Sequence, residues 1–202
     1  METYSFEDCT KAAEILREGG LVAFPTETVF GIGCRFDSRE AFDRLVSVKR
    51  RPATKPFTMM LSDSSLISEY AYVTPRQQKL IDEFMPGEVT FIFKRKKSIP
   101  DFVTLGGDTI GIRVPAHRGL LNLLSQVGVP LLVPSANRSG EAPCADSDEV
   151  KRIFKDELDG VIEGRAEGSI PSTVVLLTGE EPVVLRQGKV SSESIIEAWN
   201  RR

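Results

Sequence analysis

The chain has 202 residues, of which 41% are hydrophobic and 27% are charged, and its formal net charge is −3. These values are typical of a globular protein and argue against a disordered chain or a surface given over to nucleic acid. The chain opens without a basic-then-apolar leader, and no apolar run approaches the roughly 20 residues of a membrane span. We therefore expect a cytoplasmic protein that contacts no membrane.

One domain is expected over residues 1–202, because no repeat, low-complexity tract or linker divides the chain. Helical spacing and capping residues predict helices over residues 6–18, 38–49, 62–84 (as two helices broken at Thr74-Pro75), 117–127, 147–154 and 191–199. Strands are predicted over residues 21–24, 57–61, 89–94, 109–114, 131–133, 160–163, 173–177 and 183–185. Helices and strands alternate in the first part of the chain, and the later strands follow one another closely. This order predicts an α/β fold in which helices pack on a mixed sheet.

Several well-known site motifs are missing from the sequence. Gly31-Ile32-Gly33 is too short for a Walker loop or a dinucleotide fingerprint, and we interpret it as a turn. His117 follows a proline turn and no elbow motif precedes a serine, which argues against a Ser-His-Asp set. Cys9, Cys34 and Cys144 lack the spacing of metal ligands, so we interpret them as free thiols of a reducing cytosol. No metal ligand from protein side chains is predicted.

Two short polar motifs follow apolar, strand-like runs in different halves of the chain. One is Pro25-Thr26-Glu27-Thr28-Val29-Phe30-Gly31-Ile32-Gly33, and the other is Pro134-Ser135-Ala136-Asn137-Arg138-Ser139-Gly140. Polar residues at strand ends, with glycine and proline shaping the turn, build the ligand sites of open α/β sheets. The two motifs therefore predict one cleft assembled from both halves of the chain.

A basic cluster lies at the end of the predicted helix over residues 38–49. It consists of Lys49, Arg50, Arg51 and Lys55, with prolines that stop the helix and stiffen its exit. A basic helix end is usually a solvated end that favours the helix dipole. Lysine and arginine together also suit a polyphosphate, because the ammonium group offers a compact charge and the guanidinium can donate two parallel hydrogen bonds. Both interpretations stay open from these residues alone.

Other polar residues also lie on or beside predicted strands. Ser135 and Asn137 share one side of an extended segment, where they would either read a polar ligand or shape a turn. Thr109 and Arg113 share one face of a strand, and Arg113 needs either a ligand anion or a buried ion-pair partner. The basic run over residues 94–97 is typical of an exposed hairpin or of a contact with RNA.

Taken together, the segments resemble the YrdC/TsaC family, the threonylcarbamoyl-AMP synthases. They occur in the family's order and cover nearly the whole chain, which makes the set far more specific than any one piece. The matching pieces are residues 25–33, Lys49-x-Arg51-Pro52, Pro86-Gly87-x-x-Thr90, Arg113-Val114-Pro115-x-His117, Pro134-Ser135-Ala136-Asn137-x-Ser139-Gly140, Pro171-Ser172-Thr173-Val174-Val175 and Leu185-Arg186-x-Gly188.

The resemblance implies a YrdC-like twisted sheet of parallel and antiparallel strands, with flanking helices and a concave basic cleft. It implies a nucleotidyltransferase that makes L-threonylcarbamoyladenylate and pyrophosphate from L-threonine, bicarbonate or carbon dioxide, and ATP with Mg²⁺. The product would then serve a separate transferase complex that makes threonylcarbamoyladenosine in tRNA.

The resemblance also implies roles for individual residues. Lys49 and Arg51 would be catalytic, with no general base assigned, and we expect Lys49→Ala or Arg51→Ala to abolish turnover with little change in the thermal melt. The residues implied to face ATP are Arg51, Lys55, Thr109, Ser135, Asn137 and Arg186. Those implied to hold threonine are Thr28, Arg113, Ser135 and Ser172, and Arg113 is the natural partner of its carboxylate.

Some positions depart from the family pattern. Phe30 stands where the family often has tyrosine, Met60 where some relatives have a histidine near threonine, Glu88 where proline is common, and Leu176 where aspartate is frequent. The chain also ends soon after Arg186, without a second domain like that of longer relatives, so closure of the nucleotide site is expected to come from elsewhere.

Two rival functions follow from the same resemblance. One is an RNA-binding module that uses the concave basic surface. The acidic net charge, and the small number of aromatic residues placed among basic ones, argue against RNA binding as the main role. Weak RNA binding stays possible as a secondary property. The other is a carbamoyl-adenylate activity like that of related domains in hydrogenase maturation and carbamoyltransferases, which occur within larger multidomain chains.

Overall fold

The computed structural model describes residues 1–50 and 55–201. Its helices are α1 (Thr10–Arg17), α2 (Arg39–Lys49), α3 (Ile67–Tyr70), α4 (Pro75–Phe84), α5 (Arg118–Val127), α6 (Ser147–Phe154) and α7 (Ser192–Asn200), with short 3₁₀ turns at Ser64–Leu66 and Lys155–Glu157. Its strands are β1 (Glu2–Tyr4), β2 (Val22–Phe24), β3 (Gly31–Arg35), β4 (Met59–Met60), β5 (Ala71–Tyr72), β6 (Val89–Arg95), β7 (Thr109–Arg113), β8 (Leu131–Leu132), β9 (Gly160–Ile162), β10 (Thr173–Leu176) and β11 (Val183–Arg186).

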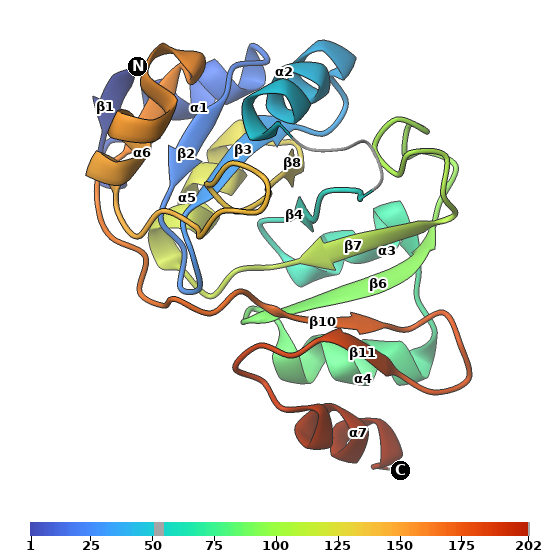
Figure 1. Ribbon diagram of the computed structural model, residues 1–202. Coiled ribbons are helices and arrows are strands. Elements are labelled where there is room, and N and C mark those ends of the chain that lie inside the picture. Colours follow the sequence, from blue (N-terminus) through green and yellow to red (C-terminus); the bar gives the residue numbers. More distant parts are fainter. Residues whose placement is uncertain (51–54, 202) are drawn as a thin grey trace.

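The strands form one mixed sheet in the order β1-β9-β2-β3-β8-β4-β7-β6-β10-β11, and β5 pairs with β6 beside this path. The pairs β1/β9, β2/β9, β4/β7 and β6/β10 are parallel, and the other pairs are antiparallel. The N-terminus and α7 lie at opposite ends of the molecule (Figure 1). This confirms the predicted α/β architecture with helices on a mixed sheet.

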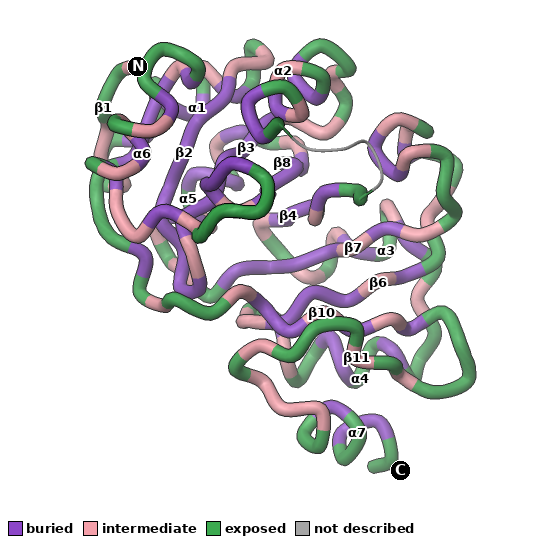
Figure 2. The backbone as a smooth tube through the Cα atoms, in the orientation of Figure 1, coloured by how far each residue is buried: buried purple, intermediate pink, exposed green. Residues whose placement is uncertain are grey.

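Helices cover the two faces of the β2 region with separate hydrophobic clusters. On one face, α1 and α5 pack against Val22 and Phe24. On the other face, α2 and α6 pack against Ala23 and Ile32. Successive residues of a strand point to opposite faces, so this short strand supplies both clusters. The strands here are buried, whereas β11 is mostly exposed (Figure 2).

In the other half of the sheet, the helices of the described residues cover one face (Figure 1). Phe84 of α4 contacts Phe91 of β6 with ring centroids 6.4 Å apart, and α7 packs on α4 through Trp199, which stacks on Arg76. Alternate residues Thr90 and Ile92 of β6 point to the opposite face, where a cavity lies. The one-sided helix layer therefore leaves a concave sheet face open for a ligand.

The interpretation of Gly31-Ile32-Gly33 as a turn is wrong, because this segment forms β3 between β2 and β8. A Cβ on Gly31 would lie 2.7 Å from a methyl carbon of Val133, and one on Gly33 would lie 2.8 Å from the Phe24 ring. The glycines therefore allow tight side-chain packing over a strand instead of a reversal of the chain.

The cysteines are free and buried, which confirms the prediction of unpaired thiols. Along residues 1–50 and 55–201, no helix combines the length and the apolar character that crossing a bilayer requires.

Candidate functional site

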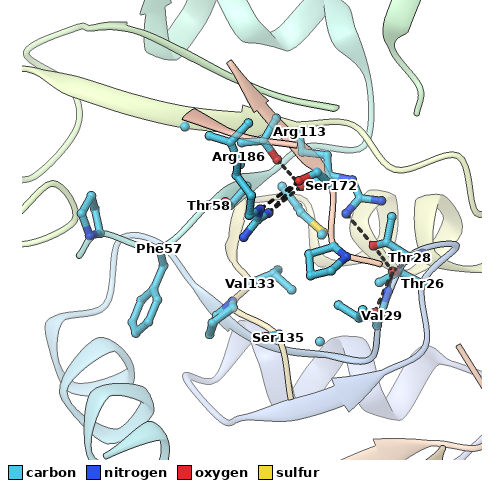
Figure 3. A pocket seen from close by; sticks show the side chains of 18 of the residues that line it. Thr26, Thr28, Val29, Phe57, Thr58, Arg113, Val133, Ser135, Ser172 and Arg186 are labelled. Atoms are coloured by element: carbon cyan, nitrogen blue, oxygen red, sulfur yellow. Dashed lines mark hydrogen bonds between the residues drawn. The ribbon is translucent and has the colours of Figure 1, made fainter. Parts of the chain in front are cut away.

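A cavity of about 500 Å³ lies over the open sheet face. Its wall combines the turn after β2, the segment that leads into β4, the inward faces of β6 and β7, the segment after β8, and the β10–β11 pair (Figure 3). Among the described residues the lining contains the cations Lys55, Arg113 and Arg186 and no carboxylate or histidine. The cavity is thus a basic hollow that suits an anionic ligand.

The structure brings together predicted site residues from distant parts of the chain. Those that line the cavity are Thr28, Lys55, Arg113, Ser135, Ser172 and Arg186. The cleft predicted from the two polar motifs is therefore present as a geometric feature. The roles of these residues toward individual ligands remain predictions.

Arg113 is held at the end of β7 with only 4% of its surface exposed. Its Nε donates to the carbonyl oxygen of Gly87 at 3.1 Å, and its Nη1 donates to Thr28 Oγ1 at 2.8 Å. Its Nη2 lies 2.7 Å from Glu27 Oε1 but makes no well-aligned hydrogen bond with the described residues. Arg113 therefore has a buried ion-pair partner and also faces the cavity with donor capacity to spare.

The turn that carries Thr28 is organised by the hydroxyl of Thr26. Thr26 Oγ1 donates to the carbonyl oxygen of Val29 at 2.8 Å and accepts from the backbone N–H groups of Thr28 and Val29. The two threonine hydroxyls lie 2.9 Å apart, and Thr28 Oγ1 also accepts from Arg113 Nη1. Thr26 thus fixes the turn that presents the Thr28 hydroxyl to the cavity.

Ser172 and Arg186 form the opposite part of the wall. Arg186 donates from Nε and Nη2 to the carbonyl oxygen of Ser172 at 3.0 and 2.8 Å, and Ser172 Oγ lies 2.9 Å from Thr90 Oγ1. Burial, and then the positive charge of Arg113, lower the pKa of Arg186. An anion bound beside the two guanidinium groups would relieve this repulsion.

Lys49 and Asn137 lie behind the wall and are not part of the cavity lining. Lys49 is 2% exposed, and its Nζ donates to Asn137 Oδ1 at 2.8 Å and to the carbonyl oxygen of Ser135. Asn137 Nδ2 donates to the carbonyl oxygens of Arg138 and Glu141, both at 2.8 Å. Both side chains therefore brace the segment that presents Ser135, and direct contact of either with ATP remains a prediction.

One further predicted residue, Thr109, is not brought into the cavity. Thr109 begins β7 and pairs with Lys94, at the far end of the strand from Arg113. Arg51 lies outside the described residues. The basic run over 94–97 is only partly the exposed hairpin that we expected, since Arg95 and Lys96 are half-buried. Arg95 donates to the carbonyl oxygens of Gly107 and Ile99 at 2.7 and 2.6 Å.

The sequence did not single out Thr26, Glu27 or Thr90 for a role, although all lie within the motifs. Thr26 orders the turn, Glu27 contacts Arg113, and Thr90 contacts Ser172. For Thr90, the period-2 alternation of β6 places it on the same face as Ile92, which was a usable signal. Thr26 acts through contacts two and three residues away, so a threonine-turn pattern was a usable signal there as well, whereas the role of Glu27 depends on a tertiary contact that no local pattern reveals.

Known proteins resemble this chain in both sequence and structure. The family model Sua5_yciO_yrdC, described as "Telomere recombination", matches residues 14–188. The chain belongs to the Sua5/YciO/YrdC family. An uncharacterized protein of Haemophilus influenzae is 37% identical over 92% of this chain and 91% of its own length. The threonylcarbamoyl-AMP synthase of Bacillus subtilis is 34% identical over 92% of this chain but 54% of the synthase, so the family member described here spans about half of it.

Solved structures of family members have the same fold. Pyrococcus abyssi Sua5 complexed with L-threonine matches with a TM-score of 0.91 and 32% identity, covering 98% of this chain and 59% of that one. Escherichia coli YciO matches with a TM-score of 0.87 and 30% identity, covering 96% of this chain and 97% of that one. The mixed sheet and flanking helices are therefore those of the Sua5/YciO fold.

The cavity lining does not fit a magnesium site made by the protein. Mg²⁺ prefers carboxylate oxygens and water, and the described lining contains no carboxylate. The expectation that Mg²⁺ accompanies ATP stays a prediction.

Proposed function

We propose that this protein makes L-threonylcarbamoyladenylate from L-threonine, bicarbonate or carbon dioxide, and ATP, with release of pyrophosphate. The observation that carries the proposal is the cavity in which Arg113, Arg186 and Lys55 meet the hydroxyls of Thr28 and Ser172. Its volume of about 500 Å³ falls within the usual range of small-molecule sites. Membership of a family in which the Pyrococcus Sua5 was crystallised with L-threonine supports the amino-acid substrate.

In this proposal, threonine binds at the end of the cavity where Arg113 and Thr28 meet. The guanidinium of Arg113, which lines the cavity, would receive the carboxylate, for which a guanidinium fork is well suited. The hydroxyl of Thr28 would form a hydrogen bond with the amine or the hydroxyl of threonine. Ser172 and Ser135 would supply further polar contacts.

The triphosphate would lie toward Lys55 and Arg186, with Ser135 between the two substrates. The amine, after losing its proton to solvent, must add to carbon dioxide, or to bicarbonate with loss of water. A carbamate oxygen must then attack the α-phosphorus as the bond to the departing pyrophosphate breaks. Several anionic groups then lie close together, and fixed cations stabilise that arrangement more effectively in a buried site than in water. Positioning and charge neutralisation therefore supply the catalysis, as in other phosphoryl chemistry, and no general base is required by this scheme.

Mg²⁺ would arrive with ATP and help neutralise its phosphates. The product would pass to a separate transferase complex that modifies tRNA. Direct RNA binding is the less supported alternative, because Arg95 in the basic run is engaged by backbone carbonyls. The chain spans about half of the Bacillus synthase, so the activity of that longer protein is proposed here for the part that the two share.

The test is incubation of the protein with ATP, Mg²⁺, bicarbonate and L-threonine, followed by detection of pyrophosphate and the adenylate by mass spectrometry. Both products are expected only when threonine and bicarbonate are present. Arg113→Lys keeps the charge but loses the fork, and we expect it to raise KM for threonine about tenfold or more. Arg201→Lys, at an exposed arginine paired with Glu83, is the matched control and should behave like wild type.

Pyrophosphate release that is indifferent to threonine would overturn the assignment. Salt-sensitive RNA binding without threonine-dependent turnover would favour the RNA-binding alternative instead.

A further inference from the structure

Glu27 is a buried carboxylate beside the cavity but is not part of its lining. The residue is 5% exposed, and its Oε1 accepts a hydrogen bond from the backbone N–H of Ala116 at 2.7 Å. The same oxygen lies 2.7 Å from Arg113 Nη2, and Oε2 has no hydrogen-bond partner among the described residues. Glu27 therefore contacts the guanidinium from within the wall, away from the ligand space.

A stability role alone gives a poor account of this carboxylate. Removing two charges from water costs several kcal/mol per ion, and buried ion pairs are often no more stable than an apolar pair of the same volume. The hydrogen bonding of Glu27 is also incomplete, because one oxygen is unpartnered among the described residues. What the arrangement does supply is a fixed direction for the guanidinium.

The guanidinium of Arg113 is held from three separate segments. Nε donates to the carbonyl oxygen of Gly87, which follows α4, and Nη1 donates to Thr28 Oγ1. Nη2 lies beside the carboxylate of Glu27. The contact with Thr28 is visible in Figure 3. Because the guanidinium is planar and rigid, contacts at three of its corners determine both its position and its plane. Glu27 also ties down the backbone at Ala116, just beyond the strand that carries Arg113.

We propose that Glu27 is a positioning residue that fixes the Arg113 guanidinium in the plane in which it binds the substrate carboxylate. The inference rests on the proposed function for the identity of that substrate. Glu27 would never touch the ligand. It would act by preventing the guanidinium from turning toward other acceptors in the wall. The side-chain entropy of Arg113 is then already lost before the substrate binds, so binding does not have to offset it.

A purely electrostatic role for Glu27 predicts the opposite sign. If Glu27 only offset the charge of Arg113, then removing its charge would leave the guanidinium in place and strengthen its attraction for a carboxylate. Loss of positioning instead weakens carboxylate binding. The direction of the change in threonine affinity therefore separates the two explanations.

The test compares Glu27→Gln with wild type. Glutamine has nearly the same shape and can still accept from Ala116 N–H, so the variant removes mainly the charge contact with Arg113. We expect the Kd and the KM for L-threonine to rise about tenfold, while KM for ATP stays within about twofold. Glu83→Gln, which neutralises the exposed partner of Arg201, is the matched control and should leave both constants unchanged.

A second variant and a structure keep the test decisive. Glu27→Asp retains the charge on a shorter side chain and should recover part of the threonine affinity; it also replaces Glu27→Gln if that variant fails to fold. In a crystal structure of Glu27→Gln, the guanidinium should have left Gly87 or Thr28. An unmoved guanidinium, or unchanged or tighter threonine binding, would overturn the inference.

The outcomes also separate this inference from the proposed function. Threonine binding by calorimetry does not depend on turnover, so a wild type that binds threonine without making adenylate would contradict the function alone. If wild type binds no threonine, the position of Arg113 in the variant crystal still decides whether Glu27 orients it.

Discussion

The ammonium group of Lys49 is buried where the segment after β8 meets the end of α2. It donates to Asn137 Oδ1 and to the carbonyl oxygen of Ser135, and Ser135 Oγ donates to the same amide oxygen at 2.6 Å. The backbone of Lys49 also accepts from Ser139 N–H at 2.9 Å. Lys49 thus joins the helix end to the motif that presents Ser135 to the cavity.

Burial of Lys49 changes the expected effect of its removal from the one that the sequence suggested. Lys49→Ala leaves the carbonyl and amide oxygens without their charged donor, so we expect the free energy of unfolding to fall by about 2 kcal/mol. Urea unfolding measures this change. Lys79→Ala, at an exposed position of α4, is the control and should fall within about 0.5 kcal/mol of wild type.

If Lys49→Ala were as stable as Lys79→Ala while turnover was lost, the bracing role would be wrong. The ammonium would then serve the ligand directly, as the family resemblance implies.

Among the elements, α2 and α6 are joined through Arg138. Its Nη1 donates to the carbonyl oxygen of Val48 near the end of α2, and its Nη2 donates to that of Ile153 near the end of α6 at 3.2 Å. Glu157 accepts from both guanidinium nitrogens, and the guanidinium stacks 4.6 Å from the centre of the Phe154 ring. A cation at two helix C-termini is also favoured by both helix dipoles.

This junction predicts a pH-dependent contribution to stability. The hydrogen bond from Arg138 lowers the pKa of Glu157 below its ordinary value of 4.5. The pair therefore contributes fully above that value and is lost as the pH falls through the lower, folded-state pKa. The side chain of Glu157 is 46% exposed, so solvent screening limits the contribution to under about 1 kcal/mol.

A double-mutant cycle measures this contribution. Wild type should lose more stability than Glu157→Gln when the pH is lowered from 7 to 3. On an Arg138→Met background the same substitution should change the pH profile little, because the partner is gone. Parallel profiles for wild type and Glu157→Gln in urea unfolding would show that the pair adds nothing.

The elements that could be predicted from sequence are those with local signals. Ser38 caps α2 by accepting from Ala41 N–H, Thr74 and Gln77 form a capping box with Pro75 in the first turn of α4, and Ser191 caps α7. Capping depends on residues within one turn, so sequence alone locates these ends. Strands β1, β3 and β5 were not predicted, since short strands are defined by partners far away in the chain.

The candidate site divides in the same way. Family resemblance singled out Thr28, Arg113, Ser172 and Arg186, and the structure brings them to one cavity. The inward direction of Lys49 could not be predicted, because it is decided by acceptors that lie 86 and 88 residues away along the chain.

At the scale of the whole molecule, the reactivity of the three buried thiols measures how well the core excludes water. Burial raises the pKa of Cys34 to about 12 and that of Cys144 to about 11, with nearby Glu149 adding to the latter, and burial also raises the pKa of Cys9. The thiolate is the reactive form, so little of it exists near neutral pH.

We therefore expect the native protein to react with a disulfide reagent at about pH 8 far more slowly than the chain in concentrated guanidinium chloride. Absorbance of the released thiol measures the rate. Saturating ATP and threonine should slow the reaction further, because ligands that bind only the native state reduce the open population. Rapid labelling of all three thiols in the native protein would contradict the buried positions.

The wall of the cavity begins at Thr26 and ends at Arg186, which lies 160 residues further along the chain. Ser172 and Arg186 enter the wall with the β10–β11 pair, which joins the sheet at its far edge. Contacts of such long sequence separation form late in folding, because loop closure opposes them until the intervening chain is ordered. A chain in which the β10–β11 pair has not yet joined the sheet therefore has Arg113 but no opposing wall. The cavity is enclosed only after the strand pair that carries Arg186 is in place.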